Sequence, residues 1–275
     1  MGPDIGERAA ARGLTVGAPR AWSLLAPVDV SAVQAELWHE GYFAGRGEPS
    51  IPTELVTRCR DAIALVLEDG APTVAAFAFD APWELQALLA DHADAALDGS
   101  AVLLPAFWAW QLTADEPRGW APHRDRPDQA LDHRGAPQSI SLWVALTDAS
   151  PDNGCMYVVP APLDVQYQNP NASAEVLHVQ CVRALPARAG AVLGWTSALL
   201  HWGGIARAGV AGRASISFEY QTARRPPPSF PLDWMPTLSE RRTLIAQQWA
   251  QYAHIHEQPP ERQARLAAVL DALGL

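Results

Sequence analysis

Apolar and polar residues follow a helical period through most of the first hundred residues. The stretch TELVTRCRDAIALVLEDG (53–70) carries apolar side chains at helical spacing and ends in Gly70, a residue type that often terminates helices. A second segment opens with Ser31 and has Gln34 three positions later, which is the pattern of a capping box. A third, DAPWELQALLADHADAAL, opens with Asp80. The pattern predicts three helices, with Ser31 and Asp80 as caps of two of them.

The pattern then changes to short β-prone runs that Gly, Pro, Asn and Asp separate. The runs lie at residues 101–113, 139–146, 155–160, 176–185, 190–197 and 213–221. Many short strands with turns between them predict a sandwich, a barrel or a jelly roll. A helical pattern returns at Thr237, where Glu240 follows three residues later as in a capping box.

This order of elements predicts one α+β domain, with a β core and helices at both ends of the chain. We expect the whole of residues 1–275 to form that domain. Its parts are mainly helical support in 1–100, the β core in 101–222 and C-terminal helices in 223–275.

Two predicted strands have one apolar face and one more polar face. The more polar face of SISLWVAL carries Ser139, Ser141, Trp143 and Ala145. That of RASISFEYQ carries Arg213, Ser215, Ser217, Glu219 and Gln221. Two interpretations stay open: an ordinary sheet with a dry and a wet face, or a barrel whose polar faces line a ligand cavity.

Composition narrows the range of partners. The formal net charge is −10, the opposite of the usual balance in nucleic-acid binders, so we expect no nucleic acid as partner. No uninterrupted apolar run is long enough for a membrane span. The three cysteines are far apart and form no C-x-x-C pair. Together with an N-terminus that lacks a secretory pattern, they predict reduced thiols in a cytoplasmic protein.

The candidate chemistry begins in GWAPHRDRPD, where His123 and Asp125 are two residues apart. The pair alone fits either a surface ion pair or two ligands of a metal. His201 lies far along the chain, and Arg213 follows it at the head of the last predicted strand. Two histidines and one carboxylate are the ligand set of non-haem iron oxygenases. The planar fork of Arg213 suits a carboxylate such as that of 2-oxoglutarate.

Four segments in this order resemble the phytanoyl-CoA dioxygenase family of iron(II)- and 2-oxoglutarate-dependent oxygenases. They are PHRDRPD, SLWVALTDASPDNGCMYVVP, GAVLGWTSALLHWGG and GRASISFEYQ, and the resemblance covers roughly residues 100 to 222. It implies a double-stranded β-helix (jelly-roll, cupin-like) core. It also implies His123, Asp125 and His201 as the iron ligands that carry catalysis. The co-substrate residues that it implies are Arg213, which binds the distal carboxylate, together with Ser215, Trp143 and Gln111.

The reaction that the resemblance implies is oxidation of a small organic molecule by iron(II), 2-oxoglutarate and O2, most simply hydroxylation, with release of succinate and CO2. Related halogenases have Ala or Gly in place of Asp125, so the aspartate favours hydroxylation. The stretch VVPAPLD departs from the family, which often has Ser-His or Thr-His after this turn. The alternative is a metal-binding jelly roll that is non-catalytic or non-oxidative, and such a protein would not need Arg213.

Candidate substrate residues surround these motifs, and we expect a specialised metabolite as the substrate. Trp120 and Trp202 belong either to an apolar pocket wall or to the core. Arg124 and Arg126 either receive an anionic substrate or neutralise nearby aspartates.

Overall fold

The computed structural model describes residues 4–113, 116, 119–169, 177–226, 232, 235–254 and 257–275. The α-helices in these ranges are α1 (Ile5–Ala11), α2 (Val30–Glu40), α3 (Thr53–Glu68), α4 (Asp80–Ala96), α5 (Leu238–Gln251) and α6 (Pro260–Ala272). The strands are β1 (Tyr42–Phe43), β2 (Ala101–Gln111), β3 (Ser139–Ala145), β4 (Met156–Val158), β5 (Arg183–Leu185), β6 (Val192–Thr196), β7 (His201–Gly203) and β8 (Ala214–Thr222). A short 3-10 turn, η6 (Tyr252–His254), follows α5.

The helix predicted at 53–70 is confirmed as α3. Its apolar positions are buried, and the chain leaves the helix before Gly70, which has a φ of +71°. The capping box of α5 is confirmed as well, because the Thr237 and Glu240 side chains each bind the backbone amide of the other. In both cases the local pattern alone is enough to specify the end of the helix.

Both of the other predicted caps are wrong. Helix α2 begins one residue before Ser31, and the carboxylate of Asp29 accepts the amide hydrogen of Ala32 at 3.0 Å. Asp80 is the first residue of α4 and caps nothing on its own helix. Its carboxylate is taken by long-range partners, which are the amides of Gly17 and Ala18 and the buried guanidinium of Arg241.

Two antiparallel sheets form the β core. The larger sheet has the order β1-β6-β3-β8-β2, and the smaller has the order β5-β4-β7. The chain at residues 119–123 extends the smaller sheet, because His123 and His201 exchange two backbone hydrogen bonds of 3.0 Å. The strand predicted at 176–185 is shorter than expected and begins at Arg183; position 176 lies outside the described residues.

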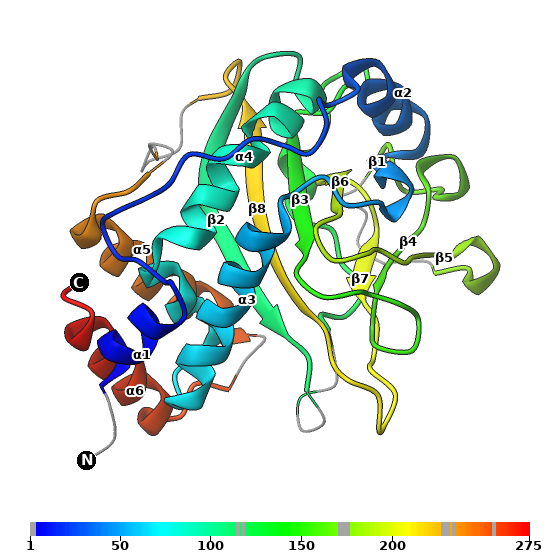
Figure 1. Ribbon diagram of the computed structural model, residues 1–275. Helices are drawn as coiled ribbons and strands as arrows, with labels where there is room; N and C mark the ends of the chain where they lie inside the picture. Colours follow the sequence, from blue (N-terminus) through cyan, green and yellow to red (C-terminus); the bar gives the residue numbers. More distant parts are fainter. Residues whose placement is uncertain are drawn as a thin grey trace.

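Helices α4 and α5 pack on the outer face of the larger sheet, and α3 packs against α4 (Figure 1). One hydrophobic core fills the space between these helices and the sheet and includes Ile140, Leu142 and Ile216. A second, smaller core lies on the inner face and includes Trp143. The two faces of β3 and β8 therefore separate as the pattern predicted, with apolar residues toward the helices.

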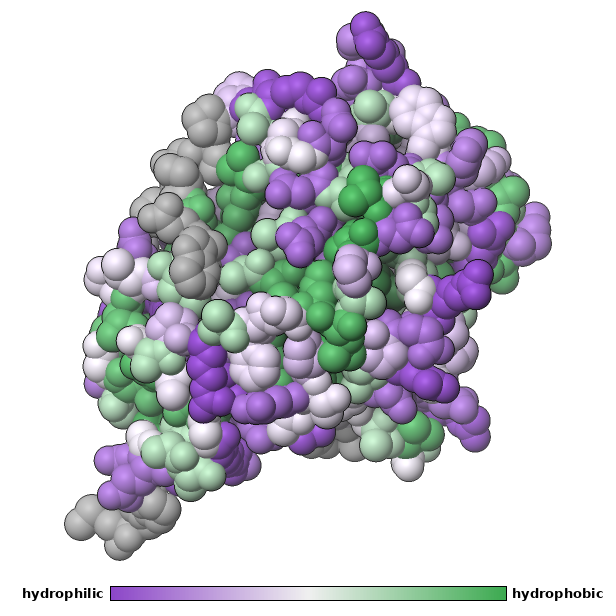
Figure 2. All heavy atoms as spheres, turned by 45° about the horizontal axis from the view of Figure 1, so that its top comes forward, coloured by the Kyte–Doolittle hydropathy of each residue, from purple (hydrophilic) through white to green (hydrophobic). Residues whose placement is uncertain are grey.

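The two ends of the chain meet, since α1 packs against α6 (Figure 1). Polar side chains spread over much of the face in Figure 2, and apolar side chains gather toward its middle. Within the described ranges, no helix combines the length and the apolarity that crossing a bilayer requires.

Candidate metal centre and its pocket

His123, Asp125 and His201 converge on one point, and their ligand atoms all lie within 4.8 Å of one another. The Nε2 atoms of His123 and His201 lie 3.3 and 3.4 Å from Oδ1 of Asp125. The sheet explains this convergence, because the backbones of the two histidines are directly paired. The three residues predicted as ligands thus come together although His123 and His201 lie 78 positions apart in the sequence.

Each histidine is held through its other ring nitrogen. Nδ1 of His123 lies 2.7 Å from the carbonyl oxygen of Ala121, and Nδ1 of His201 lies 3.1 Å from that of Leu199. A carbonyl can only accept, so Nδ1 carries the proton in both rings and Nε2 presents its lone pair. Such a second contact is the usual way in which proteins orient a metal-binding histidine.

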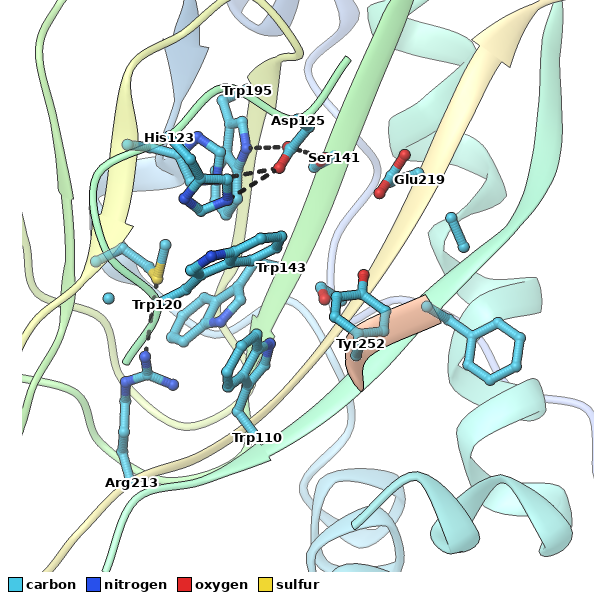
Figure 3. A pocket seen from close by; sticks show the side chains of 16 residues that line it. Trp110, Trp120, His123, Asp125, Ser141, Trp143, Trp195, Arg213, Glu219 and Tyr252 are labelled. Atoms are coloured by element: carbon cyan, nitrogen blue, oxygen red, sulfur yellow. Dashed lines mark hydrogen bonds and ion pairs between the residues drawn. The ribbon is translucent and has the colours of Figure 1, made fainter. Parts of the chain in front are cut away.

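Hydrogen bonds from Ser141 and Trp195 hold the Asp125 carboxylate through one of its two oxygens, Oδ2. Its Oδ2 accepts hydrogen bonds from the Ser141 hydroxyl at 2.5 Å and the Trp195 indole N–H at 3.0 Å. Oδ1 remains directed at the two Nε2 atoms (Figure 3). The residues therefore offer two imidazole nitrogens and one carboxylate oxygen to the same point, which fits the iron(II) site that the sequence predicts.

The electrostatics of the three groups also suit a cation. Burial lowers the pKa of His201 to about 4, so the ring is neutral near pH 7. Burial alone would raise the pKa of Asp125, but its contacts with His201, His123 and Ser141 outweigh burial and lower it. His201 and Asp125 are thus in the protonation states that metal binding needs.

Arg213 lies in the same pocket, and its guanidinium is almost fully buried. It donates to the carbonyl oxygen of Gly154 at 2.5 Å and to the Ser215 hydroxyl at 2.7 Å, and it lies over the Trp143 ring at 5.2 Å. No carboxylate among the described residues lies within ion-pair distance of it. Burial lowers its pKa to about 10, which leaves a charged guanidinium near pH 7 that requires an anion.

The pocket that holds these groups has a volume of about 530 Å³, counted to its mouth. Both sheets and η6 contribute to its wall. The residues that line it are Ala106, Phe107, Trp110, Trp120, His123, Asp125, Ser141, Trp143, Met156, Trp195, His201, Gly203, Arg213, Ser217, Glu219 and Tyr252. The interpretation in which the polar strand faces line a cavity is confirmed for Ser141, Ser217 and Glu219.

The predicted substrate and co-substrate residues divide into two groups. Trp120 lines the pocket and stacks on the His123 ring, with 3.9 Å between ring centroids. Arg126 pairs with Glu219, a pocket residue, at 2.5 Å. Ser215 and Trp143 contact Arg213, as already described.

Arg126 and Ser215 contact lining residues without lining the pocket themselves, whereas three other predicted residues bind elsewhere. Arg124 is buried and pairs with Asp164 at 2.8 Å, so its charge is already satisfied. Trp202 stacks on Tyr157, with 5.7 Å between ring centroids. Gln111 donates to the carbonyl oxygen of Leu112.

The sequence indicated no specific role at the site for Trp195 or Tyr252, and it placed Ser141 only on a strand face that could line a cavity. Trp195 appeared only within the segment GAVLGWTSALLHWGG, where nothing indicates that its indole binds Asp125. Tyr252 follows α5, and nothing in its local pattern indicates that this turn reaches the pocket.

Comparison with known proteins agrees with this geometry. The family model described as phytanoyl-CoA dioxygenase (PhyH) matches residues 66–207, just over half of the chain. Among curated proteins, none matches.

Three solved structures of similar fold illustrate the likeness. The alpha-ketoglutarate-dependent carbocyclase SnoK from nogalamycin biosynthesis is 18% identical, with a TM-score of 0.56 over 76% of this chain and 96% of that chain. The epimerase SnoN from the same biosynthesis is 21% identical, with a TM-score of 0.53 over 70% and 83%. EctD from S. alaskensis is 18% identical, with a TM-score of 0.54 over 82% and 90%.

At these identities the structures support the fold, and the family match supports the chemistry. The chain therefore belongs to the phytanoyl-CoA dioxygenase family, as an enzyme that depends on non-haem iron(II), 2-oxoglutarate and O2.

Proposed function

We propose that this protein hydroxylates a small organic molecule, with release of succinate and CO2. We further propose that its two sheets form the double-stranded β-helix of the family and that residues 1–275 act as one oxygenase domain. The proposal rests on the family match and on the site around His123, Asp125 and His201.

One observation carries the proposal furthest. The buried guanidinium of Arg213 opens into the same pocket as the three candidate iron ligands, and no described carboxylate neutralises it. An anionic co-substrate between Arg213 and the iron would satisfy it. A non-oxidative metal-binding jelly roll would have no use for this buried charge.

Each residue has a defined task in this proposal. His123, Asp125 and His201 hold the iron, and Arg213 with Ser215 binds the distal carboxylate of 2-oxoglutarate. When bound, iron(II), 2-oxoglutarate and O2 supply the oxidising chemistry. Ser141 and Trp195 keep Asp125 oriented, and Trp143 covers the Arg213 guanidinium. The aromatic lining excludes water from the reacting groups.

Two features support the proposed class of substrate and the proposed reaction, which is hydroxylation. SnoK and SnoN belong to the biosynthesis of nogalamycin, which supports a specialised metabolite as substrate here as well. Asp125 occupies the position where halogenases leave room for chloride, which supports hydroxylation. A cytoplasmic location remains a prediction from composition.

The test is an anaerobic titration of the apo-protein with iron(II) and then with 2-oxoglutarate, followed through the weak visible band of the iron–2-oxoglutarate chelate. We expect the band in the wild type. We expect no band in His201→Ala, which loses a ligand.

Replacing Arg213 by Met removes the guanidinium but keeps the bulk of the side chain. We expect the affinity for 2-oxoglutarate to fall by at least about thirtyfold, because a buried charge pair loses one partner. Arg207→Met is the matched control, since Arg207 is exposed and pairs with Asp152 at the surface. A folded wild type without the band, or an Arg213→Met variant with unchanged affinity, would contradict the proposal.

A further inference from the structure

The pocket contains a second carboxylate that the proposed chemistry does not use. Glu219 lies on β8 and lines the pocket, with its side chain 16% exposed. The neighbours of Glu219 on the chain, Phe218 and Tyr220, are buried on the opposite face of the strand. Glu219 is therefore directed into the cavity, and burial raises its pKa.

Glu219 is only partly satisfied. One oxygen, Oε2, accepts from the Nε of Arg126 at 2.5 Å. Among the described residues, no donor lies within hydrogen-bond distance of the other oxygen, Oε1. A half-buried carboxylate with one unused oxygen that faces a cavity is an acceptor for a ligand.

The position of Glu219 places this acceptor on the substrate side of the metal. Glu219 is the cross-strand partner of Ser141, and the Ser141 hydroxyl binds Asp125. Figure 3 shows Glu219 and Tyr252 on one side of the pocket and Arg213 on the other. A co-substrate bound to Arg213 therefore leaves the space beside Glu219 to the substrate.

That space has an aromatic wall, which we define as Trp110, Trp120 and Tyr252. The centroid of the Trp120 ring lies 6.4 Å from that of Trp110 and 5.8 Å from that of Tyr252. These residues come from β2, the 119–123 segment and η6, so the wall spans separate parts of the fold. Such a surface favours a molecule with an apolar, ring-shaped body.

The charges in the pocket decide which polar group fits Glu219. Formal charges of iron(II), Arg213, Asp125 and doubly charged 2-oxoglutarate sum to zero, and Glu219 is neutralised by Arg126. An ammonium group on the substrate would add an uncompensated buried charge, and a carboxylate would lie against Glu219. A hydroxyl group supplies the missing donor without adding charge.

We propose that the substrate is a neutral molecule with an apolar ring body that packs on the aromatic wall and donates a hydroxyl hydrogen to Glu219. This inference rests on the proposed function, because it assumes that iron(II) and 2-oxoglutarate fill the other side of the pocket. Glu219 is then a specificity-determining residue of the oxygenase.

The test uses the anaerobic complex of the full chain with iron(II) and 2-oxoglutarate, and four probes on one ring. The probes are naphthylmethanol, its methyl ether, naphthylmethylamine and naphthoate, and binding is measured by calorimetry. We expect the alcohol to bind about tenfold tighter than the ether, the size expected for one hydrogen bond to a charged group. Glu219→Leu should abolish that preference.

A double-variant comparison separates substrate binding from simple neutralisation of Arg126. Suppose that Glu219 only neutralises Arg126, so that Glu219→Leu acts by leaving the Arg126 charge unpaired. The variant that carries both Arg126→Met and Glu219→Leu would then regain the preference for the alcohol over the ether. If Glu219 binds the substrate hydroxyl, the double variant still shows no preference for the alcohol over the ether. Arg126→Met alone then keeps that preference.

The iron–2-oxoglutarate band distinguishes failure of the proposed oxygenase function from failure of the proposed role of Glu219. A band with equal binding of alcohol and ether, tighter binding of the amine or the carboxylate, or no binding of the alcohol overturns this inference and leaves the proposed function standing. Absence of the band in the wild type overturns the proposed function itself.

Discussion

The candidate metal site depends on short contacts within each ligand segment. Each histidine ring is fixed by the carbonyl two residues before it, so the same local arrangement occurs at Ala121–His123 and at Leu199–His201. The carboxylate is different, because Asp125 depends on donors from two other strands. We therefore expect the orientation of Asp125 to be the feature most easily perturbed without loss of a ligand.

Replacing Trp195 by Phe removes the indole N–H that binds Asp125. We expect the affinity for iron(II) to fall by about 10- to 100-fold, the usual cost of losing a contact that orients a ligand. Anaerobic metal titration measures it, and Trp202→Phe is the control, because Trp202 stacks on Tyr157 outside the pocket. Equal affinities in the two variants would mean that Ser141 alone orients the carboxylate.

His92 gives the stability a pH dependence that is separate from the metal site. The ring is buried near Phe43, its Nδ1 has no partner among the described residues, and burial lowers its pKa from 6.5 to about 4. Between these values the unfolded chain binds a proton that the folded chain does not, so stability is lost as the pH falls. The loss between about pH 7 and about pH 5 should be about 2 kcal/mol.

Urea denaturation at the two pH values measures this effect in the apo-protein. The His92→Gln variant should lose less stability than the wild type over the same interval. An identical loss in both would assign the pH dependence to other groups.

At the scale of elements, the site depends on two chain segments that approach closely. A Cβ atom on Gly203 would lie 2.9 Å from Nη2 of Arg213 and 3.0 Å from the Cα of Gly119. Strand β7 can therefore pack against the 119–123 segment and Arg213 only because both facing residues are glycine.

The sequence predicted most elements of the β core but not the short strands β1 and β7. Only three residues, His201–Gly203, form β7, and two of them carry no β-strand pattern of their own. The pairing that creates it comes from β4, more than 40 positions earlier, and from the bridge to His123, 78 positions earlier, and no local pattern can indicate either contact. The ligands were nevertheless predictable, because their residue types are those of non-haem iron sites and their order matches the motifs of the family that the sequence resembles.

We expect Gly203→Ala to disturb Arg213 more than the iron ligands. The added methyl group must displace the guanidinium or separate two backbones, which should cost about 1 to 3 kcal/mol of stability. The affinity for 2-oxoglutarate should fall while iron(II) still binds, as the same anaerobic titrations would reveal. Gly6→Ala in α1 is the control; unchanged 2-oxoglutarate affinity in Gly203→Ala would show that the pocket adapts.

At the scale of the whole molecule, the sequence did not predict which residues far apart in the chain would contact one another. Arg124 and Arg126 both stood out beside the H-x-D motif, but Arg124 is paired with Asp164 and only Arg126 reaches a pocket residue. Tyr252 enters the pocket because α5 packs along the larger sheet. These placements depend on tertiary packing, whereas helix periods and strand alternation depend on neighbours in the chain.

Unfolding of an Asp80 variant tests whether residues 1–275 behave as one domain. The Asp80 carboxylate joins the amides of Gly17 and Ala18 to Arg241 on α5, so it connects both ends of the chain to α4. Asp80→Asn leaves the Arg241 guanidinium, which is 1% exposed, without its anion. We expect the free energy of unfolding to fall by about 3 to 5 kcal/mol. Adding Arg241→Met should recover part of that loss, because the unpaired charge is removed.

Urea denaturation followed by tryptophan fluorescence and by far-ultraviolet circular dichroism distinguishes the possible outcomes. Six of the eleven tryptophans lie on the strands or in the 119–123 segment, so fluorescence reports mainly on the β core, and circular dichroism reports mainly on the helices. In a single cooperative domain, Asp80→Asn shifts both transitions together, since the helical layer and the β core share one hydrophobic interior. A helical transition that moves alone, with the fluorescence transition unchanged, would mean that the helices form a separate unit and that the single-domain prediction is wrong.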